Sequence, residues 1–162
     1  MLKDALRIQL TFVDGSLQMN LEGVSHELSL RCAGEGGNSI NWVLGHMLNT
    51  RGALLELLGG EALTGERHQS LYGRHSQNVG PGDDCESLEA LRETWKATQT
   101  ALLEKLAAAD DALLATMVPG LFEPESQEAT GVQLASLVFH EAYHAGQIGV
   151  IRRNVGMEAA IS

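Results

Sequence analysis

Apolar side chains recur along the first twenty-four residues at the spacing of one helix face. Within this stretch the segment 6–12 alternates apolar and polar residues, which is the pattern of a strand. The helical period continues beyond that segment, and no partner strand is evident further along the chain. We therefore predict a helix whose buried stripe consists of Leu2, Leu6, Leu10, Val13, Leu17, Leu21 and Val24.

Three further stretches have helical periodicity and recognisable ends. The second helix is expected to begin at a cap residue, Asn38 or Ser39, and to end before Gly59. The third runs over about 86–108 around Trp95, and a short turn is expected over 110–117. The fourth runs from a Thr130 cap to Val155 and stops at Gly156.

Four helices with this spacing predict an all-α protein, a four-helix bundle in a single domain over 1–162. Two long connections are expected, one between helices two and three and one between helices three and four. The first of them, over 61–84, is rich in glycine and polar residues and shows no periodicity, which is typical of functional or mobile segments.

The second predicted helix is apolar around most of its circumference. Its polar arc is narrow and contains Asn41, Gly45, Asn49, Gly52 and Glu56. A helix this apolar is covered on most sides, so His46 and Arg51 are expected to point into the protein. A buried cation requires a partner, and Arg51 is therefore expected to have one.

Composition narrows the class of protein. The chain has 162 residues and a formal net charge of −10, which argues against binding a nucleic-acid backbone. No apolar run approaches the ~20 residues of a membrane span, and the first residues lack the apolar core of a signal peptide. Two isolated cysteines, Cys32 and Cys85, are expected to be reduced thiols of a cytoplasmic protein.

The candidate chemistry lies in the fourth helix, where His140 and His144 are four residues apart. Residues with this spacing lie one above the other, about 40° apart around the axis and roughly 6 Å apart along it. Two such imidazoles can bind one metal ion, and apolar neighbours on the same face indicate that they point inward. Two core histidines satisfied by polar neighbours are the alternative, and the pair at this spacing makes it the less favoured one.

A metal site needs a third ligand, and the remaining histidines are the candidates. His46 is favoured because it lies in the middle of a buried helix. His26, His68 and His75 lie in connections and are expected to face solvent. Three histidines with an open coordination position describe a site that can bind water or a substrate atom.

The segment 140–144 also matches His-Glu-x-x-His, the zinc-protease motif, in which Glu141 would be the general base. Such proteases take a third ligand downstream, and only eighteen residues follow His144. The extended motif would need glycine in place of Gln147 and histidine in place of Val150. The protease is therefore a remote alternative. Glu141 remains a candidate catalytic carboxylate, or alternatively a bundle-edge residue paired with a basic one.

The segments Asn38–Leu48 and His140–Arg153 together resemble the DinB/YfiT-like metalloenzyme superfamily, and the resemblance covers essentially the whole chain. It implies a four-helix bundle, commonly dimeric, with a divalent metal bound by His46, His140 and His144. Zinc or nickel would be the metal. The resemblance also implies a metal-dependent enzyme, either a transferase using a low-molecular-weight thiol as cosubstrate or a hydrolase, acting on a small molecule.

Three points stay open at this level. The bundle could instead be a non-catalytic, stress-induced metal sensor or scaffold. Arg51, Arg152 or Arg153 could hold a substrate carboxylate, although the last two could simply favour the C-terminal end of the helix. Small residues of the fourth helix allow close packing either within the bundle or across a homodimer, namely Ala135, Ala142, Ala145, Gly146 and Gly149.

Overall fold

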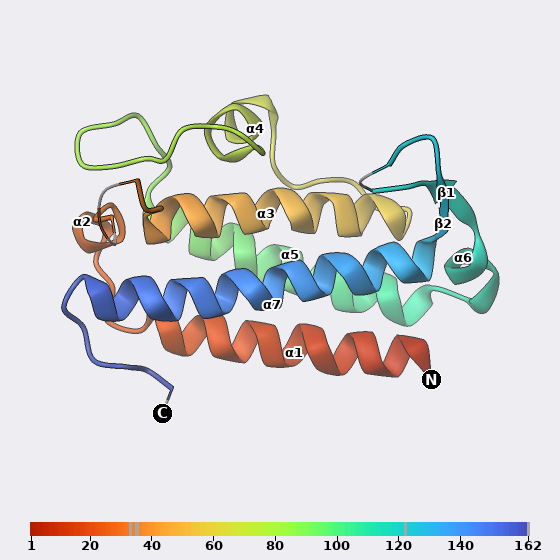
Figure 1. Cartoon of the computed structure of the whole chain (residues 1–162). Helices are drawn as coiled ribbons and strands as arrows, with labels where there is room; N and C mark the ends of the chain where they lie inside the picture. The colour runs from red at the N-terminus through yellow and green to blue at the C-terminus, as the bar shows by residue number, and fades with distance from the viewer. Residues whose placement is uncertain (33, 35, 122, 162) are drawn as a thin grey trace.

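Four long helices form the bundle in the computed structural model, which describes residues 1–32, 34, 36–121 and 123–161 (Figure 1). They correspond to the four predicted helices, and the alternating segment near the N-terminus is helical throughout. Their bounds are α1 Leu2–Leu21, α3 Ile40–Leu57, α5 Leu88–Ala108 and α7 Thr130–Asn154.

The ends of the helices follow local chemistry. Ser39 caps α3 by accepting a hydrogen bond from the Trp42 amide at 3.2 Å, as one of the two expected caps. Gly59, after the end of α3, has a φ of +70°, a conformation that glycine adopts without strain. The start of α7 differs from expectation, because Ala129 occupies the cap position. The Thr130 hydroxyl instead donates to the Thr116 carbonyl at 3.1 Å, which ties the helix to the preceding connection.

The helices α1 and α7 lie side by side and run in the same direction, whereas α3 and α5 run in the opposite one (Figure 1). Helix α3 packs on both α5 and α7. The predicted apolar stripe of α1 is buried from Leu6 to Leu21, and Leu2, at its start, is exposed. The two apolar clusters of the core draw on all four long helices.

The connections contain more structure than the sequence pattern indicates. Two short helices lie in the connections, α2 at His26–Ser29 and α6 at Asp111–Ala115, and the second matches the turn expected over 110–117. A third, α4 at Glu66–Tyr72, lies in the connection for which the sequence predicts no regular element. The last connection also holds a small antiparallel hairpin of β1, Met117–Pro119, and β2, Gln127–Ala129. The hairpin is an addition to a fold that is otherwise helical.

The connection containing α4 covers the polar arc of α3. The Tyr72 ring lies against Gly45 so closely that a Cβ added at Gly45 would be 2.4 Å from it. Ala62 approaches Gly52 in the same way, because a Cβ added at Gly52 would be 3.1 Å from the Ala62 methyl. The two glycines therefore allow the long connection to pack directly on the α3 backbone.

The small residues of α7 divide between two environments. The Asn20 side chain of α1 lies 3.1 Å from where a Cβ of Gly149 would be, and its amide donates to the Ala145 carbonyl at 3.1 Å. This part of the small-residue face packs within the bundle. Ala142 and Gly146 are exposed. Within the described residues, no helix is both long and apolar enough to cross a membrane.

Candidate metal centre

Three histidines converge where α3 passes α7. His46 of α3 and His140 and His144 of α7 each offer one ligand atom, and these atoms all lie within 4.8 Å of one another. The His46 ring centroid is 5.3 Å from that of His140 and 5.2 Å from that of His144. Among the candidate third ligands, the structure therefore brings His46 to the pair on α7.

In each of these histidines, Nδ1 is already engaged. Nδ1 of His46 is 2.9 Å from the Tyr72 carbonyl oxygen, and Nδ1 of His144 is 2.7 Å from Oε1 of Gln147. Nδ1 of His140 is 3.1 Å from the hydroxyl oxygen of Thr50. A carbonyl can only accept, so Nδ1 carries the proton in His46, and the same tautomer suits the other two. This arrangement leaves Nε2 of each ring with a free lone pair for a metal ion.

The Nε2 atoms of His140 and His144 are 3.0 Å apart. Two imidazole nitrogens that bind one tetrahedral ion at 2.0–2.1 Å are separated by roughly 3.3 Å, close to this spacing. Two unprotonated nitrogens this close repel each other unless a proton or a cation lies between them. The donor set, its tautomers and its spacing therefore fit a divalent transition metal.

The environment keeps the α7 pair uncharged. Burial lowers the pKa of His140 to about 4, and the neighbouring His144 and His46 contribute to this shift. Burial also lowers the pKa of His144, against the opposing effect of Gln147. Both rings are consequently neutral at pH 7, which is the form that binds metals.

These pKa shifts predict how the metal-free protein responds to acid. Between pH about 4 and 6.5 the unfolded chain binds more protons at His140 than the folded chain, so the free energy of unfolding falls as the pH is lowered through this window. Urea denaturation of the metal-free protein at pH 7.5, 6 and 5 measures this fall. The fall will be smaller in His140→Ala, while His75→Asn, a change at an exposed histidine with positive φ, will leave it unaltered. Equal pH dependence in wild type and His140→Ala would contradict the buried, neutral state of the ring.

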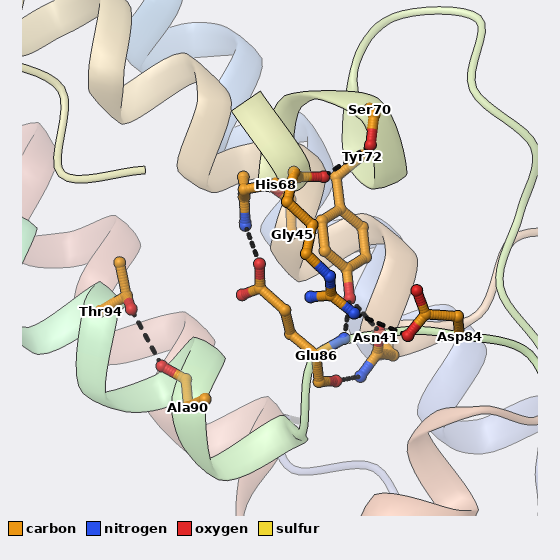
Figure 2. A network of polar contacts seen from close by, with 10 residues as sticks. Asn41, Gly45, His68, Ser70, Tyr72, Asp84, Glu86, Ala90 and Thr94 are labelled. Atoms are coloured by element: carbon orange, nitrogen blue, oxygen red, sulfur yellow. Dashed lines mark hydrogen bonds and ion pairs between the residues drawn. The ribbon is translucent and has the colours of Figure 1, made fainter. Parts of the chain in front are cut away.

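His68 is buried, contrary to the expectation that it faces solvent. Its Nε2 lies 2.9 Å from the Gly45 carbonyl oxygen, and its Nδ1 lies 3.0 Å from a Glu86 carboxylate oxygen (Figure 2). It is not part of the metal group. It fastens α4 to α3 beside His46. His75 is exposed, as expected, and His26 accepts a hydrogen bond from the Leu88 amide.

Tyr72 completes the attachment of α4 to α3. Its hydroxyl donates to Oδ1 of Asn41 at 3.0 Å and accepts from the Glu86 amide at 2.8 Å (Figure 2). Burial raises the pKa of this hydroxyl above its ordinary value, so it remains a donor. Because the Tyr72 carbonyl orients His46, the contacts that fix α4 also fix the third ligand. Trp42 stacks on the same imidazole, with ring centroids 4.9 Å apart.

Arg51 and Glu141 form an ion pair in the core, with both side chains fully buried. Nη2 of Arg51 donates to Oε2 of Glu141 at 3.2 Å, and Nε faces Oε1 at 3.2 Å outside hydrogen-bond geometry. The guanidinium also lies over the Trp95 ring, 3.2 Å from its centroid. Burial raises the pKa of Glu141 and lowers that of Arg51, and each charge opposes the shift of the other.

The sequence left alternatives open for both Arg51 and Glu141, and the ion pair shows where each side chain lies. The expected partner of Arg51 is Glu141, so this arginine is not available to a substrate carboxylate. Glu141 lies outside the group of atoms that can bind the metal, and it pairs with a basic residue in the core instead of at the bundle edge. The structure therefore shows Glu141 in the ion-pair arrangement that the sequence offered as an alternative to a catalytic one. Successive contacts, Thr50 with His140 and Arg51 with Glu141, hold α3 and α7 in register.

The remaining arginine candidates lie at the far end of α7. Arg152 donates to the carbonyl of Asn20 at 3.1 Å and also to those of Glu22 and Glu158. It satisfies carbonyls at the end of α1, a structural role. Arg153 is exposed near the same helix end.

A cavity of about 1090 Å³ opens beside the histidines, and both His46 and His140 contribute to its wall. Most other lining residues come from α3 and from the segment around α4. The wall carries polar side chains, including Thr50, Gln69 and Ser70, and three charged ones, Glu56, Glu66 and Arg74. The Asn49 amide, also on this wall, is buried and has no hydrogen-bond partner among the described residues.

Comparison with known families gives a match over most of the chain. The family model described as the DinB superfamily matches residues 9–148, a range that includes all three histidines. No curated protein matches the sequence. The chain belongs to the DinB superfamily.

Proposed function

We propose, starting from this membership of the DinB superfamily, that the protein is a metal-dependent enzyme acting on a small molecule. His46, His140 and His144 would hold one divalent transition metal, with zinc or nickel as the expected ion. The reaction would be either transfer to a low-molecular-weight thiol or hydrolysis. The observation that carries the proposal is the triad itself, with every Nδ1 paired to an oxygen of the protein and every Nε2 directed at the position of the ion.

The position of the triad supports catalysis over a purely structural metal. A structural zinc site is closed by four protein ligands, whereas a catalytic site keeps one position open. Among the described histidines, cysteines and acidic residues, the group that could hold an ion contains three members. Two of them, His46 and His140, line the cavity, so a substrate in the cavity would lie against the site.

A divalent ion held in this way would act as a Lewis acid and would favour the deprotonated form of a bound water molecule or thiol. The protein supplies the orientation. Tyr72 and Gln147 accept the Nδ1 protons of His46 and His144 and thereby fix the ring planes. Among the described residues, no cysteine belongs to the ligand group, so a thiol in the reaction would be a cosubstrate.

The cavity lining suits a polar substrate. The buried Asn49 amide has one acceptor and two donors to offer, and burying such a group without a partner costs free energy. A substrate carrying an amide or carboxylate would satisfy it. Low-molecular-weight thiols built from amino acids carry both groups.

The test begins with the metal content of the purified protein, measured by elemental analysis. The metal-loaded protein is then assayed with glutathione, cysteine and related thiols against an aromatic chloride, and separately with activated esters. In the transfer reaction a carbon–sulfur bond forms, the carbon–chlorine bond breaks, and chloride and a proton are released. We expect turnover in one of the two assays, at least ~100-fold reduced in His140→Ala and unchanged in His75→Asn.

The control variants separate the possible outcomes. One bound metal per chain with no turnover of any thiol or ester would reject the enzyme and favour the non-catalytic metal-binding bundle. Turnover that persists in His140→Ala would place the chemistry elsewhere in the molecule. Turnover that depends on the histidines but not on added thiol would select hydrolysis.

A further inference from the structure

Three charged side chains on the wall of the polar cavity have no ion-pair partner in the part of the chain that the structure describes. They are two carboxylates, Glu56 and Glu66, and the guanidinium of Arg74, and all three are exposed. Arg67, a residue of α4 that does not line the cavity, pairs with Asp84 at 2.6 Å. The charges that face the cavity are therefore available to a ligand, whereas the neighbouring charge outside it is not.

The connection that lines the cavity runs back along α3, opposite to the direction of the helix (Figure 1). Near its start, Ala62 lies against Gly52, since a Cβ added at that glycine would be 3.1 Å from the Ala62 methyl. At the end of α4, Tyr72 lies against Gly45, and its carbonyl oxygen is 2.9 Å from Nδ1 of His46. The connection therefore passes from the C-terminal half of α3 to the metal centre.

The path of this connection places the three charges in order along the cavity. Arg74 follows Tyr72 by two residues and lies at the end of the cavity beside the three histidines. Glu66, the first residue of α4, lies in the chain between the two contacts with α3. Glu56 is ten residues after His46 on α3, which is roughly 15 Å further along the helix axis. The cavity is therefore cationic at the metal end and anionic away from it.

An unsatisfied amide lies between the two ends of the cavity. Asn49 is three residues after His46, about 4.5 Å further along the axis of α3. Its side-chain oxygen and nitrogen are buried, and neither has a hydrogen-bond partner among the described residues. Gln69 of α4 adds a second amide to the same wall. An amide bond of a ligand at this point would supply both the donor and the acceptor that the Asn49 side chain lacks.

The order of charges selects among classes of small molecule. A ligand with negative charge alone is repelled by the two glutamates, and a ligand with positive charge alone is repelled by Arg74 and by a divalent ion at the histidines. A zwitterion suits both ends if its ammonium group lies away from the metal. An extended tripeptide spans about 10–11 Å, and the reach of the glutamate side chains covers the remaining separation.

We propose that the cavity binds a peptide-like zwitterion, with its ammonium group at Glu56 and Glu66, its amide at Asn49 and its carboxylate at Arg74. The inference rests on the proposed function, in which the cavity receives the thiol cosubstrate. It narrows that cosubstrate to a compound of two or three amino-acid units with a free amino group and its thiol beside the histidines. A thiol compound whose amino group is acylated lacks the contact with the two glutamates and binds more weakly.

Isothermal titration of the Zn²⁺-loaded protein with the tripeptide glycyl-S-methylcysteinyl-glycine tests the proposal. This tripeptide carries one charge at each end, and its blocked sulfur cannot react. Its N-acetyl derivative lacks the ammonium charge, and its C-terminal amide lacks the carboxylate charge. We expect each derivative to bind about 10-fold more weakly than the parent tripeptide, because each loses its contact with one end of the cavity.

Three variants assign the two contacts to residues. The double variant Glu56→Gln, Glu66→Gln should bind the parent tripeptide about 10-fold more weakly and the N-acetyl derivative as wild type does. Arg74→Gln should weaken binding of the parent and leave that of the C-terminal amide unchanged. Glu61→Gln, at an exposed glutamate of the same connection outside the cavity, is the matched control and will bind all three peptides as wild type does. Circular dichroism should show wild-type helical content in every variant, since all these positions are exposed.

Equal affinity for the parent tripeptide and its N-acetyl derivative would overturn the proposal. Affinity that the double glutamate variant leaves unchanged, or no measurable binding of the parent, would do the same. Because the measurement is of binding, its failure can be told apart from failure of the proposed function. Charge-dependent binding without turnover of any thiol would support the zwitterion site and reject the enzyme. Histidine-dependent turnover with no preference for a free amino group would support the enzyme and overturn the zwitterion site.

Discussion

His46→Ala is expected to abolish specific metal binding while the bundle remains folded. The substitution removes one of three imidazoles and leaves two, both on α7, which is too few for tight binding by a divalent transition metal. We expect affinity to fall by more than about 100-fold, beyond the 10- to 100-fold effect of losing a group that only orients a ligand. Isothermal titration of the metal-free protein with Zn²⁺ and Ni²⁺ measures the change.

Two companion variants make this result interpretable. His140→Ala should lose affinity to the same extent, since both residues contribute one ligand atom to the same group. His75→Asn removes an exposed histidine, and asparagine tolerates the positive φ of that position. It should bind metal as wild type does. If His46→Ala also retained wild-type affinity, the three-histidine centre would be wrong.

Glu141→Ala is expected to cost about 3–5 kcal/mol in free energy of unfolding, because it leaves the Arg51 guanidinium buried without its anionic partner. The cost is large relative to the ordinary stability of a domain, so the variant will unfold at a markedly lower urea concentration. Equilibrium urea denaturation of the metal-free protein measures the change. The same variant should also bind metal more weakly, since the pair holds the two ligand-bearing helices in register.

The double variant Arg51→Met, Glu141→Leu tests whether the unpaired charge causes this loss of stability. It removes both charges and keeps apolar volume in the core, so most of the stability should return. A single Glu141→Ala variant that costs less than about 1 kcal/mol would show that the pair contributes little. A double variant as unstable as the single one would show that packing around Trp95, and not the unpaired charge, determines the effect.

The four helices could be predicted because α1, α5 and α7 each bury a periodic stripe, and because α3 is a long apolar segment with recognisable ends. In α1 the helical stripe extends over more residues than the alternating segment 6–12, so the helix was the correct prediction. In α3 the Ser39 cap and Gly59 mark the two ends correctly. The short helix α4 escapes prediction because His68 and Tyr72 are its buried residues and Leu71 is half-buried, which is too little to form a period. The hairpin escapes prediction for a similar reason, since its strands have three residues each and no alternation.

The candidate metal ligands can be found from spacing and burial alone, because two histidines four residues apart on an inward face leave few alternatives. The groups that orient these histidines cannot be found in this way, because most of them lie far from the histidines in the sequence. Tyr72 acts on His46 through its backbone carbonyl, which no side-chain pattern reveals. Gln147 lies on the same helix face as the histidines, and its position three residues after His144 is the available signal. The burial of His68 depends on acceptors contributed by Gly45 and Glu86, whose proximity only the fold establishes.

The two ligand-bearing helices are separated by almost the entire chain, and this separation has a consequence for assembly. In the unfolded polypeptide the imidazole of His46 is far from the pair on α7. Three imidazoles can therefore bind one ion only after α7 has packed against α3. An ion bound at this site would therefore be a ligand of the finished bundle and would stabilise it by mass action. If the protein binds such an ion, we expect it to melt at a lower temperature in a chelating buffer than in a metal-containing one, with the same fold in both.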